Sequence, residues 1–367
     1  MAAVEEGLHC ELSIAAPETT TLQLQYSSFY IESSTSLTKR TIKKHPTTTM
    51  VKLIMGGAGL SDSAYFNTPE IRAKVLDLLL SEGVTTLDTA RLYQGSEVAI
   101  GALEKRTSFT IDTKLVGGFG PGAVTKDGVI KDAQDSLSRV AIAQFDVLYL
   151  HAPDTSIPFA ETLAGINEVH KKGVFRRFGL SNFSAAQVQQ VYDIARENNY
   201  VLPTVYQGNY SAVARHLETL LFPTLKKLGI KFYAYSPIAG GFLTKTPADL
   251  DAGKGRFNEA AIGGMYSKLY DRPALRAALG KWNQIAADEG VEKAELAYRW
   301  VAHHSAIAGD EENGVIFGAS RFEQIAQTVR GLKRGRLSEG AVRGIEEIWE
   351  SVKEEAPVDN FNRFKKD

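Results

Sequence analysis

The sequence contains few of the features that indicate a secreted, membrane-bound or nucleic-acid-binding protein. Its 367 residues include a single cysteine, Cys10, which excludes an internal disulfide and suits a reducing compartment. No apolar run reaches the roughly 18 residues that span a bilayer. Lysine and arginine total 42 against 43 aspartates and glutamates, so no basic field points to nucleic acid or to an anionic membrane. We therefore expect a soluble, cytoplasmic protein whose partner is a small molecule, with no nucleic acid, membrane or metal ion as partner.

The first 49 residues differ in composition from the rest. They are rich in serine and threonine and carry a basic cluster between residues 39 and 44, which predicts a poorly ordered extension. Their glutamates are unusual for a transit peptide, and Met50 directly precedes the first strand-like run. A targeting segment and a mis-assigned upstream start both stay open. We assign residues 1–49 to a disordered extension and residues 50–367 to one folded domain.

From residue 51 onward, short runs rich in β-formers alternate with longer stretches of helical period, which is typical of βα units and a parallel sheet. One such helix, PEIRAKVLDLLLS over 69–81, begins with proline and has one apolar face. The predicted strands cover residues 52–56, 85–88, 109–113, 145–150, 175–181, 204–207, 231–235 and 314–318. Further helices are predicted over residues 160–172, 185–197, 215–228, 274–289, 293–303, 322–332 and 339–353.

Eight strands interleaved with helices predict an α/β fold, a (β/α)₈ TIM barrel formed by a single domain. A doubly wound open sheet gives similar local signals. However, no strand is followed by G-x-G-x-x-G, and the glycines of GGAG at 56–59 lack that spacing. The even distribution of the apolar runs also favours the barrel.

Polar side chains stand at the C-terminal ends of the predicted strands, the face on which barrel active sites are built. Asp88 closes the second strand, Tyr93 lies in the loop after it, Lys114 follows the third strand and His151 follows the fourth. Taken singly, each fits an ordinary structural role, such as a turn former, a loop aromatic or a strand-end charge. Together on one face of a barrel, they predict one catalytic site.

Elementary chemistry explains why these four residue types belong together. A tyrosine hydroxyl has a pKa of about 10, so it is a poor acid at neutral pH unless a cation favours its ionised form. Lys114 can supply that cation, and Asp88 can hold Lys114 charged and oriented through an ion pair. A neutral His151 can donate a hydrogen bond to a substrate carbonyl oxygen near the Tyr93 hydroxyl. The arrangement suits proton donation to a developing alkoxide, and it requires a source of hydride.

The motifs that carry these residues resemble the aldo-keto reductase superfamily. The matching pieces are LDTARLYQGSE with Asp88 and Tyr93, DTK with Lys114, YLHAPD with His151, and GLSNF. The stretches LFPTLKKLGIKFYAYSPIAGGFLT, GRF and VIFGASRFEQI are most similar to the aflatoxin B1 aldehyde reductase branch. The resemblance implies a (β/α)₈ barrel that reduces aldehydes or ketones with NADPH, uses the four residues as its catalytic set, and forms a homodimer.

The resemblance also implies a set of NADPH-binding residues. Three polar residues would bind the nicotinamide carboxamide, a tyrosine would stack on its ring, a glycine-containing segment would wrap the pyrophosphate, and an arginine would suit the 2′-phosphate. The set is Asp88, Ser181, Asn182, Gln207, Tyr235, Ser236, Pro237, Ile238, Gly240, Gly241, Leu243, Lys245, Arg256, Ser320, Arg321, Gln324 and Thr328. Ser236 and Thr328 stand where the branch usually carries asparagine, and both can replace its hydrogen bonds.

Substrate contacts are predicted for His151, Phe119, Tyr210, Tyr266 and Arg363. Arg363 either receives an anionic substrate group or is only a charge near the chain end. Two alternatives to a general aldehyde reductase stay open. One is an NADPH-binding regulatory subunit resembling the potassium-channel β subunits, which keep the same four residues. The other is a reductase dedicated to one secondary metabolite, since substrate choice depends on loops and does not follow from the sequence alone.

Overall fold

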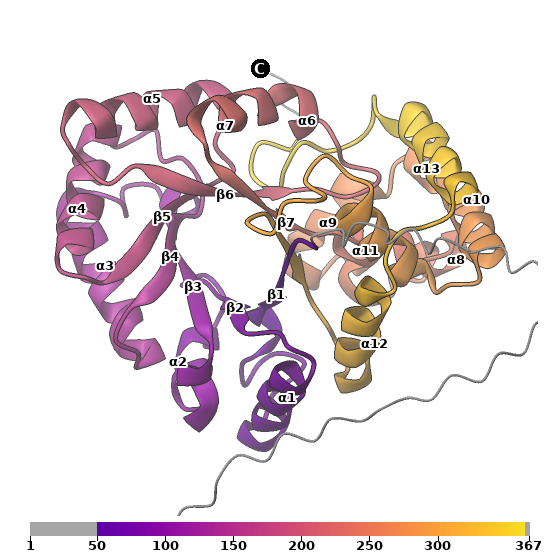
Figure 1. Cartoon of the computed structure of the whole chain (residues 1–367), viewed down its shortest axis with the longest axis horizontal. Helices are drawn as coiled ribbons and strands as arrows, with labels where there is room; N and C mark the ends of the chain where they lie inside the picture. Colours follow the sequence, from indigo (N-terminus) through magenta and orange to yellow (C-terminus); the bar gives the residue numbers. More distant parts are fainter. Residues whose placement is uncertain (1–49, 364–367) are drawn as a thin grey trace, which may run out of the picture. The chain divides into compact units, whose positions relative to one another are not determined.

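The structure, a computed structural model, describes residues 50–363, and the predicted N-terminal extension lies outside that range. Eight parallel strands close into a barrel in sequence order (Figure 1), which confirms the predicted (β/α)₈ fold. The strands are β1 (Lys52–Gly56), β2 (Thr86–Asp88), β3 (Thr110–Leu115), β4 (Phe145–Leu150), β5 (Phe175–Ser181), β6 (Pro203–Asn209), β7 (Lys231–Tyr235) and β8 (Gly314–Phe317).

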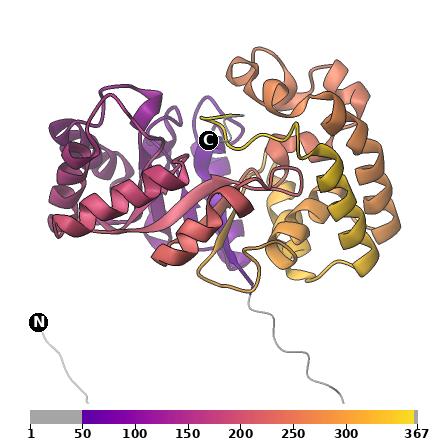
Figure 2. The ribbon, with the colours of Figure 1, turned by 90° about the horizontal axis from the view of Figure 1, so that it is seen from above.

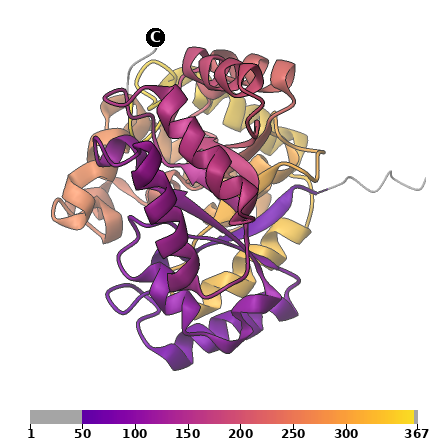
Figure 3. The ribbon, with the colours of Figure 1, turned by 90° about the vertical axis from the view of Figure 1, so that its left-hand side faces the viewer.

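Helices surround the strands, and Figure 3 shows those from the first half of the chain, indigo to magenta, on the outer side of the barrel. Within residues 50–363 no helix is both long and apolar enough to cross a membrane. The helices are α1 (Pro69–Ser81), α2 (Ser96–Gly101), α3 (Lys126–Val140), α4 (Phe159–Lys171), α5 (Ala185–Glu197), α6 (Leu217–Leu220), α7 (Phe222–Leu228), α8 (Pro247–Asp251), α9 (Met265–Tyr270), α10 (Pro273–Glu289), α11 (Lys293–His303), α12 (Phe322–Lys333) and α13 (Glu339–Val352).

The helices differ from the predicted ones in several places, and the short helices α8 and α9 were not predicted. The single helix expected over 215–228 is two, α6 and α7, because Leu221 leaves the helical region with a φ of -130°, and a new helix begins at Phe222 with Pro223 in its first turn. Helices α2 and α3 have no counterpart among the predicted ones. Most residues of α3 are polar and its buried face carries alanine and serine beside valines, so few large apolar residues mark this helix in the sequence.

The register of the barrel brings the polar strand ends level with one another. Asp88 on β2 pairs with Asp112 on β3, and Lys114 on β3 pairs with Tyr149 on β4. Because side chains alternate along a strand, Asp112 and Lys114 share one face of β3. A small apolar cluster drawn from strands all around the barrel fills its interior: Ile54, Val147, Tyr149, Val205, Tyr233 and Ile316.

The carboxyl group of Asp112, on β3, lies inside the barrel. Asp112 is fully buried, and its Oδ1 accepts a hydrogen bond from the backbone nitrogen of Val147 at 3.1 Å. Its Oδ2 has no hydrogen-bond partner among the described residues, so the ionised form is poorly stabilised. Burial, followed by the charges of Asp146 and Asp88, raises the pKa of Asp112 to about 8. This group is therefore largely a neutral acid at neutral pH.

Replacing Asp112 with asparagine is expected to stabilise the fold at alkaline pH. The pKa is about 8 in the folded state and about 3.9 in an unfolded chain, so folding becomes less favourable as the pH rises between those values. Asparagine has the shape of the protonated acid, keeps an acceptor for Val147 and does not titrate. The thermal midpoint of the variant should exceed that of the parent most near pH 8 and least near pH 5. If the difference in thermal midpoint between the variant and the parent stayed constant from pH 5 to pH 8, the raised pKa of Asp112 would be contradicted.

Candidate active site

A lysine and an aspartate form a buried ion pair at the carboxyl end of the barrel. Lys114 is 0% exposed, and its Nζ lies 2.5 Å from Asp88 Oδ2. Lys114 also donates to the carbonyl oxygen of Thr89 at 2.8 Å, while Asp88 Oδ1 accepts from Gln207 Nε2 at 2.8 Å. Burial is the largest single influence and lowers the pKa of Lys114, but the charges of Asp88 and Tyr93, together with the Asp88 hydrogen bond, raise that pKa overall. The pair therefore holds one fixed ammonium charge inside the site.

Tyr93 lies over this charge. The Lys114 ammonium is 5.0 Å from the centroid of the Tyr93 ring. Burial raises the pKa of Tyr93 above its usual value, and the Lys114 charge opposes that rise. The hydroxyl is thus protonated at neutral pH, and a cation stands beside it that stabilises the phenolate once the proton leaves.

His151 completes the predicted group of four. It follows β4, and its ring meets Tyr93 edge-on, with the centroids 6.1 Å apart and the planes at 82°. Burial, followed by the Lys114 charge, lowers the pKa of His151 to about 3. Its Nδ1 is buried and has no hydrogen-bond partner within residues 50–363. The structure therefore brings together the four predicted residues, with a neutral imidazole whose hydrogen-bonding capacity is not used up.

Predicted nicotinamide-binding residues lie beside this group. At the end of β5, Asn182 Nδ2 donates to the His151 carbonyl oxygen at 2.8 Å and to Ser181 Oγ at 3.2 Å. The Tyr235 hydroxyl, at the end of β7, donates to Asn182 Oδ1 at 2.8 Å. Gln207 joins the set through its bond to Asp88. Strands β5, β6 and β7 thus each contribute polar side chains to a surface beside the four-residue group.

A C-terminal turn, residues 358–363, also holds this surface and was not expected from the sequence. The backbone nitrogen of Asn360 donates to the Tyr235 hydroxyl at 3.2 Å, and Asn362 Nδ2 donates to the Asn182 carbonyl oxygen at 2.9 Å. Buried Asp359 accepts hydrogen bonds from backbone N–H groups of the same turn. In Figure 2 the yellow end of the chain crosses the barrel. These partners are up to 180 residues apart, so no local pattern could have found them.

The loop after β7 forms a backbone cradle. Ser236, Ala239, Gly240 and Gly241 all have positive φ, between 52° and 103°. A Cβ on Gly240 would lie 2.0 Å from the ring of Tyr266, so only glycine fits there. Successive left-handed residues of this kind form concavities of backbone N–H groups that bind anions. The other predicted members of the segment are Pro237, Ile238, Leu243 and Lys245.

Two cations beside this cradle form no ion pair within the part of the chain that the structure describes. The Lys245 ammonium would lie 3.8 Å from a Cβ placed on Gly255, and Arg256 is the next residue. Arg256 Nη1 donates to the Tyr266 hydroxyl at 3.3 Å and its guanidinium lies 5.3 Å from that ring. Adjacent cations without carboxylate partners suit a multiply charged anion such as a pyrophosphate. The donor set therefore fits the phosphate-bearing cofactor that the sequence predicts.

The remaining predicted cofactor residues lie at the start of α12. Arg321, Gln324 and Thr328 are spaced so that they share one face of its first turns. Gln324 Oε1 accepts from the backbone nitrogens of Ser320 at 2.9 Å and Arg321 at 3.2 Å, which fixes the helix start. The positive end of the helix dipole adds to the attraction for an anion.

An aromatic wall stands next to His151. The ring of Phe119 lies 5.1 Å from the imidazole and 5.1 Å from Phe361 of the C-terminal turn, and it is 42% exposed. Arg363, the last described residue, is exposed and has a φ of 57°. Phe119 is thus close to the four-residue group, as a substrate contact requires, and Phe361 is a neighbour that the motifs did not reveal.

Tyr210, also predicted to contact the substrate, is not part of this group. It is 0% exposed, and its hydroxyl donates to Glu218 and accepts from the Ala306 backbone nitrogen at 3.1 Å. Its ring packs against Phe222 and Phe232. The structure therefore places Tyr210 in the core between β7 and the helices rather than at the mouth of the barrel.

Fold and geometry define a (β/α)₈ barrel whose polar groups converge at the carboxyl ends of the strands. Comparison with known proteins identifies the family to which this barrel belongs. Residues 52–350 match the Aldo/keto reductase family. The chain is 40% identical over 294 residues to Oxidoreductase sirO of Leptosphaeria maculans, covering 79% of this chain and 89% of that protein.

Two mammalian relatives point the same way. Aldo-keto reductase family 7 member A3 of Homo sapiens is 35% identical over 307 residues, covering 78% of this chain and 90% of the relative. Aflatoxin B1 aldehyde reductase member 2 of Rattus norvegicus is 34% identical over 309 residues, covering 78% and 82%. The chain belongs to the aldo/keto reductase family and is an oxidoreductase, which confirms the family, the branch similarity and the enzyme class predicted from the motifs.

Proposed function

We propose that this chain is a cytoplasmic, NADPH-dependent reductase that converts aldehydes or ketones to alcohols. The observation that carries the proposal is the buried Lys114–Asp88 pair directly beside the Tyr93 ring. When bound, NADPH supplies the hydride that the carbonyl carbon receives. The residues 50–367 would form the catalytic domain.

In this mechanism Tyr93 gives its hydroxyl proton to the substrate oxygen as that oxygen becomes an alkoxide. The phenolate left behind lies beside the Lys114 ammonium, which lowers the cost of the transfer. Asp88 keeps Lys114 oriented, and its second oxygen is engaged by Gln207. The neutral His151 ring holds the carbonyl oxygen by a hydrogen bond and does not compete as a proton source.

Binding of the cofactor would use the surfaces described above. The amides of Asn182 and Gln207, with Ser181, would hold the carboxamide, and Tyr235 would stack on the nicotinamide. The cradle from Ser236 to Gly241, with Lys245, Arg256 and the neighbouring residues of its segment, would receive the pyrophosphate. Ser320, Arg321, Gln324 and Thr328 would contact the adenosine end, where Arg321 suits a 2′-phosphate.

Replacing Arg321 with alanine is expected to weaken binding of NADPH by about tenfold or more, because a charge-assisted contact is worth about 1.5–3 kcal/mol. NADH lacks the 2′-phosphate, so its affinity should change little. Fluorescence titration of both cofactors measures the difference. Arg330→Ala is the matched control, since Arg330 lies on the same helix but pairs with Glu82 at 2.7 Å. Equal weakening of both cofactors would contradict the assignment of the 2′-phosphate to Arg321.

The proposed function is tested by assaying a panel of aldehydes and ketones with NADPH and NADH in parallel. We expect turnover in the range of ordinary enzymes, about 1–10³ per second, for the best carbonyl with NADPH. The preferred carbonyls would also define the substrate class. Tight NADPH binding with negligible turnover on the whole panel would contradict the proposal and favour the regulatory-subunit alternative.

A further inference from the structure

Tyr93 differs from its three partners in how the fold holds it. Asp88 and Lys114 lie within strands and His151 follows its strand directly, whereas Tyr93 lies in the loop after β2. That loop buries little apolar surface around Tyr93, because Leu92 is 40% exposed and residues 94–95 are also exposed. Polar contacts must therefore fix its position.

The backbone of this loop follows β3 for a short distance beyond the end of β2. The Thr89 nitrogen donates to the Asp112 carbonyl oxygen at 2.8 Å, and the Arg91 nitrogen donates to the Lys114 carbonyl oxygen at 3.2 Å. The Tyr93 nitrogen then donates to the carbonyl oxygen of residue 90 at 3.0 Å and closes a turn. Arg91 and Tyr93 thus belong to one turn, so a shift of one moves the other.

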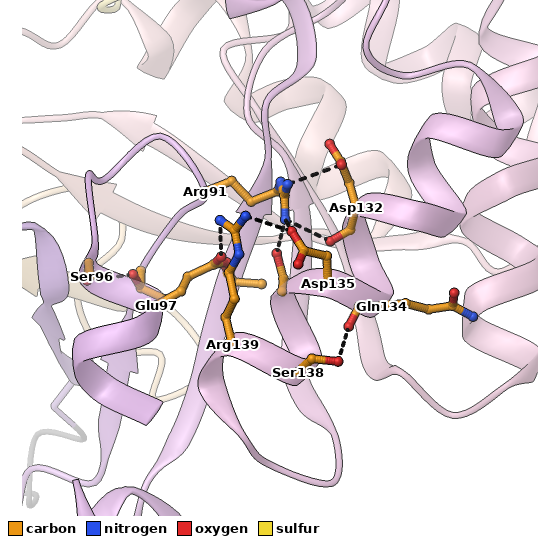
Figure 4. Close-up of polar contacts among 11 residues, drawn as sticks. Arg91, Ser96, Glu97, Asp132, Gln134, Asp135, Ser138 and Arg139 are labelled. Atoms are coloured by element: carbon orange, nitrogen blue, oxygen red, sulfur yellow. Dashed lines mark hydrogen bonds and ion pairs between the residues drawn. The ribbon is translucent and has the colours of Figure 1, made fainter. Parts of the chain in front are cut away.

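The Arg91 side chain leaves this turn and binds α3 (Figure 4). Its Nη1 lies 3.0 Å from the Asp132 carbonyl oxygen, 2.9 Å from Asp135 Oδ2 and 3.0 Å from Ser136 Oγ. Its Nη2 lies 3.1 Å from Asp132 Oδ1, and the side chain is only 12% exposed. The Arg91 hydrogen bond, ahead of the Arg139 charge, lowers the pKa of Asp135, so this carboxylate stays ionised. A planar guanidinium with this many partners has one favourable position.

A second contact holds the far end of the loop. Glu97, in the first turn of α2 and 3% exposed, accepts a hydrogen bond from Thr113 Oγ1 at 2.7 Å. Thr113 precedes Lys114 on β3. The chain is therefore tied on both sides of Tyr93, by Arg91 to α3 and by Glu97 to β3.

We propose that Arg91 is a positioning residue for Tyr93: by binding Asp132, Asp135 and Ser136 on α3, it sets where the Tyr93 hydroxyl stands relative to the carbonyl oxygen. The proposal rests on the proton-donor role of Tyr93 proposed above. Small displacements matter because a shift of about 1 Å at a reacting group can cost about 100-fold in rate.

Arg91→Lys tests this with a conservative change, because lysine keeps the charge but cannot reproduce the forked contacts. We expect kcat to fall about tenfold or more while the dissociation constant of NADPH changes less than about twofold. The matched control is Arg139→Lys. Arg139 also binds Asp135, at 2.8 Å, and approaches Glu97 at 4.0 Å, but it lies on α3 and is outside the Tyr93 turn (Figure 4). Its kcat should stay within about twofold of the parent.

Ser136→Ala supplies a second, milder variant, since it removes one acceptor of Arg91 without altering the loop. It should lower kcat in the same direction as Arg91→Lys, again with NADPH binding unchanged. If Arg91→Lys and Ser136→Ala both had the same kcat as the parent, the proposal would be overturned.

A double-mutant cycle separates positioning from a general structural role. In a Tyr93→Phe background, Arg91→Lys should cause no further loss of the residual turnover, because the group it positions is absent. If Arg91→Lys lowered turnover by the same factor in the parent and in the Tyr93→Phe background, the proposal would be overturned. Full turnover of Tyr93→Phe alone would instead overturn the proton-donor assignment, so the two failures are distinguishable.

Discussion

Tyr93→Phe is expected to abolish most NADPH-linked reduction of a reactive aldehyde while leaving cofactor binding nearly intact. Only the hydroxyl is lost, and the ring that faces Lys114 and His151 remains. General acid catalysis contributes typically about 10²–10⁴-fold, so kcat should fall by that factor. Steady-state rates with a simple aromatic aldehyde, together with a fluorescence titration of NADPH, measure both halves of the expectation.

A suitable control for this variant is Tyr192→Phe, since Tyr192 is a partly buried tyrosine of α5 that packs on the core. It loses a hydroxyl of the same kind and should keep parent kinetics. If Tyr93→Phe retained full turnover, the proton would have to come from another group. A parallel loss of NADPH affinity would instead show that the hydroxyl serves cofactor binding.

Lys114→Met is expected to remove both turnover and stability. The pair with Asp88 is almost completely buried, with side-chain exposures of 0% and 2%. Removing one member leaves a buried carboxylate without its counter-charge, which typically costs about 3–5 kcal/mol. The phenolate at Tyr93 would also lose its stabilising cation. Thermal unfolding and steady-state kinetics on the same preparation test the two effects.

A companion variant separates those effects. Lys114→Met combined with Asp88→Asn removes both charges, and the asparagine keeps an oxygen for Gln207. The thermal midpoint should recover a large part of the loss, because the unpaired charge is gone, while turnover should stay low. Recovery of turnover in the double variant would show that the ammonium is not needed for the reaction.

Much of the fold could be predicted because its signals are local. Each strand is a short apolar run, and β1, β4, β5 and β7 have the expected bounds. The four-residue group was predictable for the same reason, since Asp88 and His151 mark strand ends, and the strand ends of a barrel meet at one face. Adjacency of Asp88, Lys114 and His151 follows from the topology, whereas the place of Tyr93 depends on the loop after β2.

The remaining features depend on contacts between distant parts of the chain. Tyr210 follows a strand end as the predicted site residues do, yet its partners Glu218 and Ala306 draw it into the core. The contacts of Arg91 with α3 also could not be predicted, because that helix is mostly polar and its acidic residues have the pattern of a solvent-exposed face. In both cases, the position of a side chain depends on a partner that the local sequence pattern does not indicate.

The C-terminal turn has a consequence for the timing of synthesis. Asn362 reaches Asn182, and Asn360 reaches Tyr235, so the polar surface beside His151 is assembled from the middle and the very end of the described chain. A ribosome makes these segments many seconds apart at about 5–20 residues per second. A nascent chain in which β8 (Gly314–Phe317) has just been made therefore still lacks Asn360 and Asn362, and the polar surface beside His151 is incomplete until they follow.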